Sequence, residues 1–176
     1  MRTGVTSASV INLAAFECAA SCVMTALNIA GLNYNYFLLS YFHLTYYASL
    51  IMSVKNMIHM NLEYAFGIRR EMAWGTEANM IRWLQENNML MLQCQASRLQ
   101  FFPAHMLGGE GAQFQHYLLI YGYDRDKRMF QVIDPIVQYI GQMSMEELSA
   151  ASSDSATVAS GVVKSSAPSA AATSGS

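Results

Sequence analysis

Apolar and polar residues follow one another along the chain in patterns that predict both helices and strands. An apolar run over residues 18–30 carries no charge and ends at Gly31, which predicts a buried helix with a glycine stop. Residues 77–87 follow Thr76, a good N-cap, and place Glu77 in the first turn, where the helix dipole favours an acid. A long run over residues 36–57, almost without charge, predicts a third helix that is largely buried.

The second half of the chain has the patterns of strands. Residues 89–95 alternate between two sets of side chains, which predicts a strand with one buried face. Residues 115–123 and 128–133 are rich in aromatic and β-branched residues and flank a polar stretch, residues 124–127, which predicts a β-hairpin. Residues 101–111 contain a proline and a glycine pair and predict a loop. These elements together indicate an α+β fold.

The hairpin makes a specific prediction about two polar side chains. If its turn is centred near Arg125, the numbers of cross-strand partners sum to about 250, and His116 then faces Asp134. Residues directly opposite in an antiparallel pair point to the same face, with Cβ atoms roughly 4.5–5.5 Å apart. A register shift of one residue would move one of them to the other face. The spacing therefore predicts a carboxylate beside an imidazole.

The low charge of the first half raises the question of a membrane segment. No Lys, Arg, Asp or Glu occurs between residues 18 and 53, and residues 36–54 are long enough to span a bilayer. However, this stretch contains several Asn, Ser, Thr and His residues, and its tyrosines run through the middle rather than gathering at the two ends. A buried helical pair is the favoured interpretation, and a membrane span is the alternative. The N-terminus does not resemble a signal peptide.

Composition narrows the class of protein. The chain has 176 residues, of which 53% are hydrophobic and 12% charged, with a net charge of -2 and three cysteines. This charge gives no reason to expect nucleic acid as a partner, and an odd, small number of cysteines favours a reducing, cytoplasmic setting. Residues 149–176 are mostly Ser and Ala, so we expect one domain over residues 1–148 followed by a disordered tail.

Three side chains have the chemistry of a cysteine nucleophile and its partners. Cys18 stands at the start of the predicted first helix, where the positive end of the dipole and a nearby imidazolium would favour the thiolate. His116 would carry protons, and Asp134 would fix the orientation of the ring. Asn12, six residues before Cys18, could donate a side-chain N–H to an oxyanion together with the backbone N–H of Cys18.

Structural roles are the alternatives for each of these residues. A cysteine in an apolar helix is usually a small buried hydrophobe, which is how we interpret Cys22 and Cys94. An Asn before a helix is often a turn former, and an Asp before a proline is a common turn residue. Cys18 and Cys22 are spaced so that they could share a metal, but no second pair of suitable ligands accompanies them. We therefore expect neither metal nor cofactor.

These residues resemble the motifs of a known family. Glu17-Cys18-Ala19 with Gly31 resembles the Asp-Cys-Gly…Gly segment of papain-like C39 peptidase domains, and His116 through Asp124 followed by Asp134-Pro135 resembles their His…Gly-Tyr-Asp…Asp-Pro hairpin. In that family Cys, His and Asp form the catalytic triad, which carries onto Cys18, His116 and Asp134. A Gln lines the oxyanion hole six residues before the Cys, where this chain has Asn12.

The departures from that pattern are similar to a second group. The aromatic stretch after the nucleophile helix, and residues 141–148 after the Asp-Pro, resemble the C39-like N-terminal domain of the butirosin biosynthesis protein H family, whose members are acyltransferases. The resemblance covers roughly residues 10–148. It implies a papain-like fold in which the nucleophile helix packs on an antiparallel sheet, with helices from residues 36–87 covering it.

The expected function is acyl transfer through a Cys18 thioester. The resemblance implies a carrier-protein thioester as donor and an amine on a secondary metabolite or peptide as acceptor, so the expected partners are a small-molecule or peptide substrate and an acyl carrier protein. The same triad could instead hydrolyse a peptide or amide. A non-catalytic binding domain of the same fold, or a membrane-associated helical protein, are the remaining alternatives.

Overall fold

A computed structural model describes residues 4–13, 17–41, 44–47, 50–53, 62–63, 65–107, 115–152 and 158–163. The helices are α1 (Cys18–Ile29), α2 (Asn35–Tyr41), α4 (Glu77–Gln85) and α5 (Met145–Ala151), with short 3-10 helices η1 (Ser7–Ser9), η3 (Ala96–Arg98) and η4 (Ala104–Met106). The strands are β1 (Leu44–Tyr47), β2 (Leu50–Ser53), β3 (Arg69–Trp74), β4 (Met89–Gln95), β5 (Gln115–Asp124), β6 (Met129–Asp134), β7 (Tyr139–Met143) and β8 (Val158–Val163).

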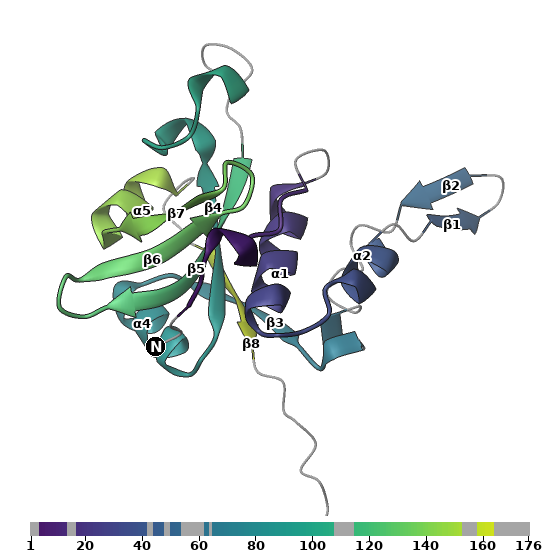
Figure 1. The fold of residues 1–176 in the computed structure, drawn as a ribbon, viewed down its shortest axis with the longest axis horizontal. Helices are drawn as coiled ribbons and strands as arrows, with labels where there is room; N and C mark the ends of the chain where they lie inside the picture. The colour runs from purple at the N-terminus through teal and green to yellow at the C-terminus, as the bar shows by residue number, and fades with distance from the viewer. Residues whose placement is uncertain are drawn as a thin grey trace, which may run out of the picture.

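An antiparallel sheet with strand order β3-β8-β4-β5-β6-β7 forms the centre of the molecule (Figure 1). The helix α1 packs on one face, where Met24 and Leu27 meet Leu119 and Ile133. The other face carries a second core cluster, to which α4 contributes Met80 and α5 contributes Leu148. The expected α+β class is thus confirmed at the level of an antiparallel sheet with helices.

Strand β4 differs from its prediction because helices cover both faces of the sheet. Leu90 and Leu92 are buried in the cluster shared with α4 and α5. Met89 and Met91, on the opposite face, are buried in the cluster shared with α1. The alternation along the strand therefore separates two apolar cores, and the expectation of a single buried face was wrong.

The helices predicted over residues 18–30 and 77–87 are confirmed as α1 and α4. The glycine that was expected to end the first and the threonine that was expected to begin the second are confirmed as well. Gly31 has φ +74°, a left-handed conformation that favours glycine, and the N–H of Leu32 donates to the carbonyl of Leu27 over 2.9 Å, which closes α1 with a Schellman motif. At the start of α4 the side chain of Thr76 accepts from the N–H of Asn79 over 3.3 Å. The hairpin is confirmed as β5 and β6.

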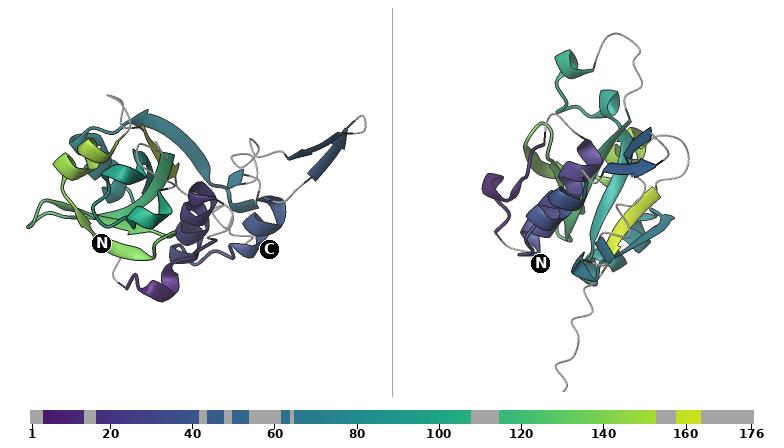
Figure 2. Two further views of the ribbon diagram at one scale, coloured as in Figure 1. Left: turned by 90° about the horizontal axis from the view of Figure 1, so that it is seen from above. Right: turned by 90° about the vertical axis from the view of Figure 1, so that its right-hand side faces the viewer.

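The prediction of one helix over residues 36–57 was wrong. The helix α2 ends at Tyr41, and β1 and β2 then pair with Leu44 opposite Ser53 and Tyr47 opposite Leu50, forming a hairpin that projects away from the main sheet (Figures 1 and 2). The stretch contains several aromatic and β-branched residues, which favour strands, whereas low charge alone fits a buried helix equally well. The helices expected to cover the sheet from residues 36–87 are thus replaced in part by β1, β2 and β3.

No helix in the described parts of the chain is long and apolar enough to cross a membrane.

The predicted boundary after residue 148 also needs correction. The helix α5 continues through it to Ala151, and Val158–Val163 forms β8, which lies between β3 and β4 and pairs with both. Composition suggested disorder because Ser and Ala bury little surface. However, the segment also contains three β-branched valines, and both neighbouring strands offer it backbone hydrogen bonds. The rest of the expected tail, residues 153–157 and 164–176, lies outside the described residues.

The N-terminal lead-in, residues 9–13, is held against α1 by polar side chains of that helix. The N–H of Ile11 donates to Thr25 Oγ1 over 3.0 Å, and the N–H of Leu13 donates to Ser21 Oγ over 3.2 Å. Ser21 and Thr25 are fully buried. They lie four residues apart on one side of the helix, so they satisfy backbone groups of the lead-in that burial would otherwise leave unpaired.

We predict that Thr25→Val lowers the free energy of unfolding by about 1–3 kcal/mol, because valine keeps the volume but leaves the partly buried N–H of Ile11 without its acceptor. Urea denaturation measures the change. The variant Thr25→Ser keeps the hydroxyl and loses one methyl group, so it should cost less. A valine variant that is no less stable than the serine variant would contradict this account of the lead-in.

Candidate active site

Cys18 is the first residue of α1, and the first turn of this helix is fixed to the sheet. One turn further on, the thiol of Cys22 donates to the carbonyl of Tyr117 in β5 over 3.4 Å. Tyr117 follows His116 directly, so this contact places the start of α1 beside the residue predicted as its base. Cys18 is partly exposed, while Cys22 and Cys94 are buried, and all three cysteines are free thiols.

His116 and Asp134 form a buried pair. The distance from His116 Nε2 to Asp134 Oδ2 is 2.7 Å, and both side chains are 0% exposed. His116 lies near the start of β5 and Asp134 ends β6, so the antiparallel arrangement brings both to the same end of the sheet. The predicted contact between these two side chains is therefore present.

The register that produces this contact differs from the predicted one by two residues. Leu119 pairs with Ile133 and Ile120 with Val132, and the register then shifts at a bulge before Gly122. His116 and Asp134 are therefore diagonal neighbours rather than directly opposite. A shift of two residues, unlike a shift of one, keeps both side chains on the same face of the sheet, and a diagonal pair is within reach of long side chains.

The second oxygen of the Asp134 carboxylate is held by the turn that follows it. Asp134 Oδ1 accepts from the N–H of Ile136 over 3.0 Å and from that of Val137 over 3.5 Å. Such a turn is typical of an Asp that precedes a proline. Because both oxygens are engaged, the carboxylate has one fixed orientation towards the imidazole.

The surroundings of His116 favour its protonated form. Burial of the ring lowers its pKa, but hydrogen bonds to Asp134 and to Cys18, together with the charges of these two groups, raise the pKa to about 9. Since Nε2 faces Asp134, the nitrogen available to Cys18 is Nδ1. The ring thus interacts with both a carboxylate and a thiol, and its Nε2 is the atom that contacts the carboxylate.

The other two cysteines have the environment of inert thiols. Burial, followed by the charge of Asp134, raises the pKa of Cys94 to about 12 and that of Cys22 well above its ordinary value. Cys94 lies directly opposite His116 in the pairing of β4 with β5. Their predicted role as small buried residues agrees with this burial.

Two residues near this end of the sheet were not identified from the sequence. The ring of Phe102 meets that of His116 edge-on, with 5.0 Å between the centroids, and covers the imidazole from the loop between β4 and β5. Gln95 is 9% exposed, one residue from Cys94, and its Oε1 has no hydrogen-bond partner within the described part of the chain. A polar residue that ends an apolar strand was the available signal for Gln95, whereas Phe102 carried none.

Asn12 lies beside the Asp134 turn. Its Nδ2 donates to the carbonyl of Ile136 over 3.0 Å. One N–H of the amide is therefore engaged, and the second remains for the predicted oxyanion role, which stays a prediction.

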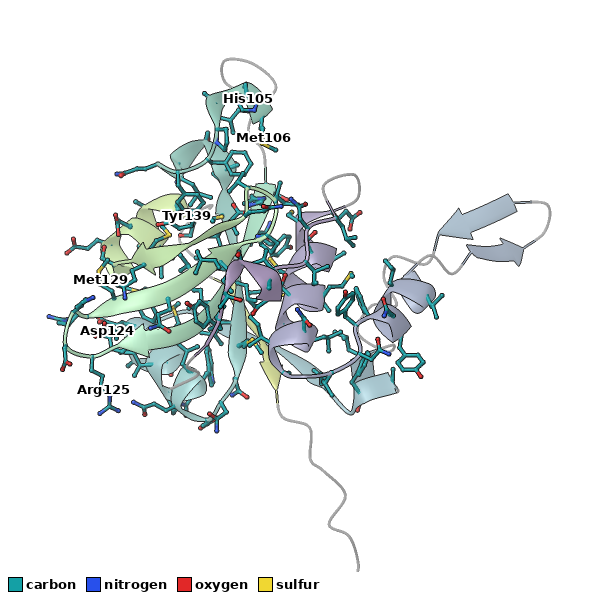
Figure 3. The ribbon with its side chains drawn as sticks, viewed as in Figure 1. His105, Met106, Asp124, Arg125, Met129 and Tyr139 are labelled. Atoms are coloured by element: carbon teal, nitrogen blue, oxygen red, sulfur yellow. The ribbon has the colours of Figure 1, made fainter. Side chains whose placement is uncertain are left out.

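The β5–β6 turn, with Asp124 and Arg125, lies at the opposite end of the sheet from the loop that carries His105 and Met106 (Figure 3). A cavity of about 330 Å³ has the stacked rings of Phe101 and Tyr139 in its wall, and α5 contributes Glu147 and Ala150 to its lining. Tyr139 is the partner of Asp134 in the β6–β7 pairing.

Among the residues that the structure describes, no group of three or more His, Cys, Asp or Glu is placed to hold a metal ion.

We predict that the stability of the protein falls as the pH rises from about 6.5 to about 9. Below this window His116 is protonated in both the folded and the unfolded chain, whereas within it only the folded chain keeps the proton. The difference between a pKa of about 9 in the folded chain and 6.5 in the unfolded chain corresponds to roughly 3 kcal/mol in the free energy of unfolding. Urea midpoints across the window measure it. Asp134→Asn should flatten the profile and His105→Gln, at an exposed position, should not; a flat profile in the unaltered protein would contradict the assignment.

Scanned against models of known protein families and against curated proteins, the chain gives no match. The case for its function therefore comes from the site itself, in which the chain brings together a partly exposed thiol, an imidazole and a buried carboxylate.

Proposed function

We propose that the chain is a cysteine acyltransferase that forms a thioester on Cys18. The observation that carries this proposal is the His116 ring, held between the Asp134 carboxylate at 2.7 Å and the Cys18 thiol. A nucleophile, a base and a group that orients the base are the recurring parts of such sites.

In the first step the sulfur of Cys18 attacks the carbonyl carbon of a thioester donor. A bond forms between this sulfur and the acyl carbon, and the bond from the acyl carbon to the donor's sulfur breaks. The imidazolium of His116 gives its Nδ1 proton to the departing thiolate, so the products are the acylated Cys18, a neutral His116 and a free donor thiol.

In the second step an amine attacks the acylated cysteine. A carbon–nitrogen bond forms and the bond to Cys18 breaks, while His116 takes the proton that the amine loses. This restores the thiolate and the imidazolium and releases an amide. The backbone N–H of Cys18 and the amide of Asn12 are the proposed donors to the oxyanion in both steps.

The preference for transfer comes from the likeness to the butirosin biosynthesis protein H family, which implies a carrier-protein thioester as donor and an amine of a secondary metabolite or peptide as acceptor. The burial of His116 and Asp134, with Phe102 against the His116 ring, supports it, because a site that shields its base from water favours an amine over water as the second nucleophile. Hydrolysis of an amide or peptide shares the acylation step and differs in the second nucleophile.

We predict that iodoacetamide at neutral pH alkylates Cys18 at least about tenfold faster than Cys22 or Cys94, because the latter two are buried and their pKa is raised. Peptide mapping after short exposures gives the three rates. His116→Gln should slow alkylation of Cys18 towards the rate of an ordinary exposed thiol. If Cys22 or Cys94 reacts as fast as Cys18, the thiol is not activated and the proposal is wrong.

We predict that incubation with short acyl-thioesters adds one acyl group to the protein, visible as an increase in intact mass, and that Cys18→Ser abolishes the adduct. His116→Gln should slow its formation by about 10²–10⁴-fold, the range expected for loss of a general acid–base. Addition of amines should then release the amide. Release of the free acid alone would favour a hydrolase, and failure of every acyl donor to form an adduct would favour a binding domain.

A further inference from the structure

The side chain of Asn12 joins two parts of the chain that are far apart in sequence. Asn12 belongs to the lead-in, and its Nδ2 reaches the carbonyl of Ile136, in the turn between β6 and β7, over 3.0 Å. The N–H of the same Ile136 residue donates to Asp134 Oδ1 over 3.0 Å. Ile136 is therefore held by Asn12 through its carbonyl and holds Asp134 through its N–H.

The other end of this connection is the nucleophile helix. The two neighbours of Asn12, Ile11 and Leu13, are fixed by their N–H groups to the buried hydroxyls of Thr25 and Ser21 in α1. The contacts thus form a closed circuit. It runs from α1 to the lead-in, through Asn12 and Ile136 to Asp134, and from Asp134 through His116 back to Cys18 at the start of the same helix.

The Asn12 amide is not explained by stability alone. Its Oδ1 is buried and has no hydrogen-bond partner among the residues that the structure describes. An orphaned acceptor of this kind lowers the stability of the folded chain, and an apolar side chain of the same size would avoid that cost. An apolar side chain, however, would lack the N–H that Asn12 donates to the carbonyl of Ile136.

We propose that Asn12 is a positioning residue that sets the orientation of the Asp134 carboxylate, and through it the protonation of His116, by holding the carbonyl of Ile136. The inference rests on the proposed roles of Cys18 and His116, and it adds to the oxyanion role predicted for Asn12 a role that operates before any substrate binds. Loss of the Asn12 amide loosens the Asp134 turn, so the hydrogen bond from His116 to Asp134 weakens.

Alkylation by iodoacetamide separates the two roles. Displacement of iodide at a CH₂ group produces no oxyanion, so a residue that only stabilises an oxyanion does not affect it. In Asn12→Leu, which keeps the volume and removes the donor, the positioning role predicts that alkylation of Cys18 at neutral pH slows about fivefold, the factor that corresponds to one ordinary hydrogen bond. The titration midpoint of the His116 ring, followed by NMR, should fall from about 9 towards 6.5.

The matched control is Asn28→Leu. Asn28 Nδ2 also donates to a lead-in carbonyl, that of Ser9, over 3.0 Å, but does not contact the Asp134 turn. It should leave both the alkylation rate and the His116 midpoint unchanged. Should Asn12→Leu fail to fold, Asn12→Ala gives the same test, because it also lacks the N–H and adds no charge beside Asp134.

Unchanged alkylation and an unchanged His116 midpoint in the Asn12 variants would overturn the inference, whether or not acyl transfer also falls. So would equal effects from Asn28→Leu, because they would show a general loosening of the lead-in. Both readouts are independent of any acyl donor, so the positioning role is decided even if the protein proves to transfer no acyl group.

Discussion

The structure of the site depends on a charged pair that is removed from water. His116 and Asp134 are both 0% exposed, and a buried charge is tolerated only when its partners are supplied by the fold. Both oxygens of the Asp134 carboxylate have such partners. Oδ2 contacts His116, and Oδ1 accepts from the N–H groups of Ile136 and Val137. Removal of one partner of such a pair costs about 3–5 kcal/mol, so these contacts are a structural requirement whatever reaction they serve.

This requirement explains why the helix α1 and the sheet form one unit. The thiol of Cys22 bonds to the β5 backbone, the hydroxyls of Ser21 and Thr25 hold the lead-in, and the lead-in holds the turn after Asp134 through Asn12. The apolar contacts between α1 and the sheet supply most of the stabilisation, while these few polar contacts fix the relative positions to the precision that a thiol and an imidazole need. Polar residues in an otherwise apolar helix therefore have a positional role here.

The sequence was sufficient to predict the contact between His116 and Asp134, and it was less informative about the elements at the edges of the fold. Cys18, His116 and Asp134 were identified because helix and hairpin signals are local, and because the two-residue error in register preserved the shared face. Ser21 and Thr25 could have been recognised as a polar pair four residues apart in an apolar helix. The β1–β2 hairpin and β8 were missed for a different reason: uncharged or Ser/Ala-rich stretches become strands only when partners in space offer hydrogen bonds. The bulge before Gly122 had one signal in the sequence, a glycine inside a strand-like run, which was not used.

The central claim is that Cys18 and His116 form one reactive unit, with Asp134 behind the ring. A crystal structure of the full chain at neutral pH tests it most directly through the distance from Cys18 Sγ to His116 Nδ1. The account predicts about 3–4 Å, with Nε2 of the same ring on Asp134, allowing for the looser geometry of a site without substrate. A separation well over about 6 Å, or an imidazole turned away from the thiol, would contradict the account.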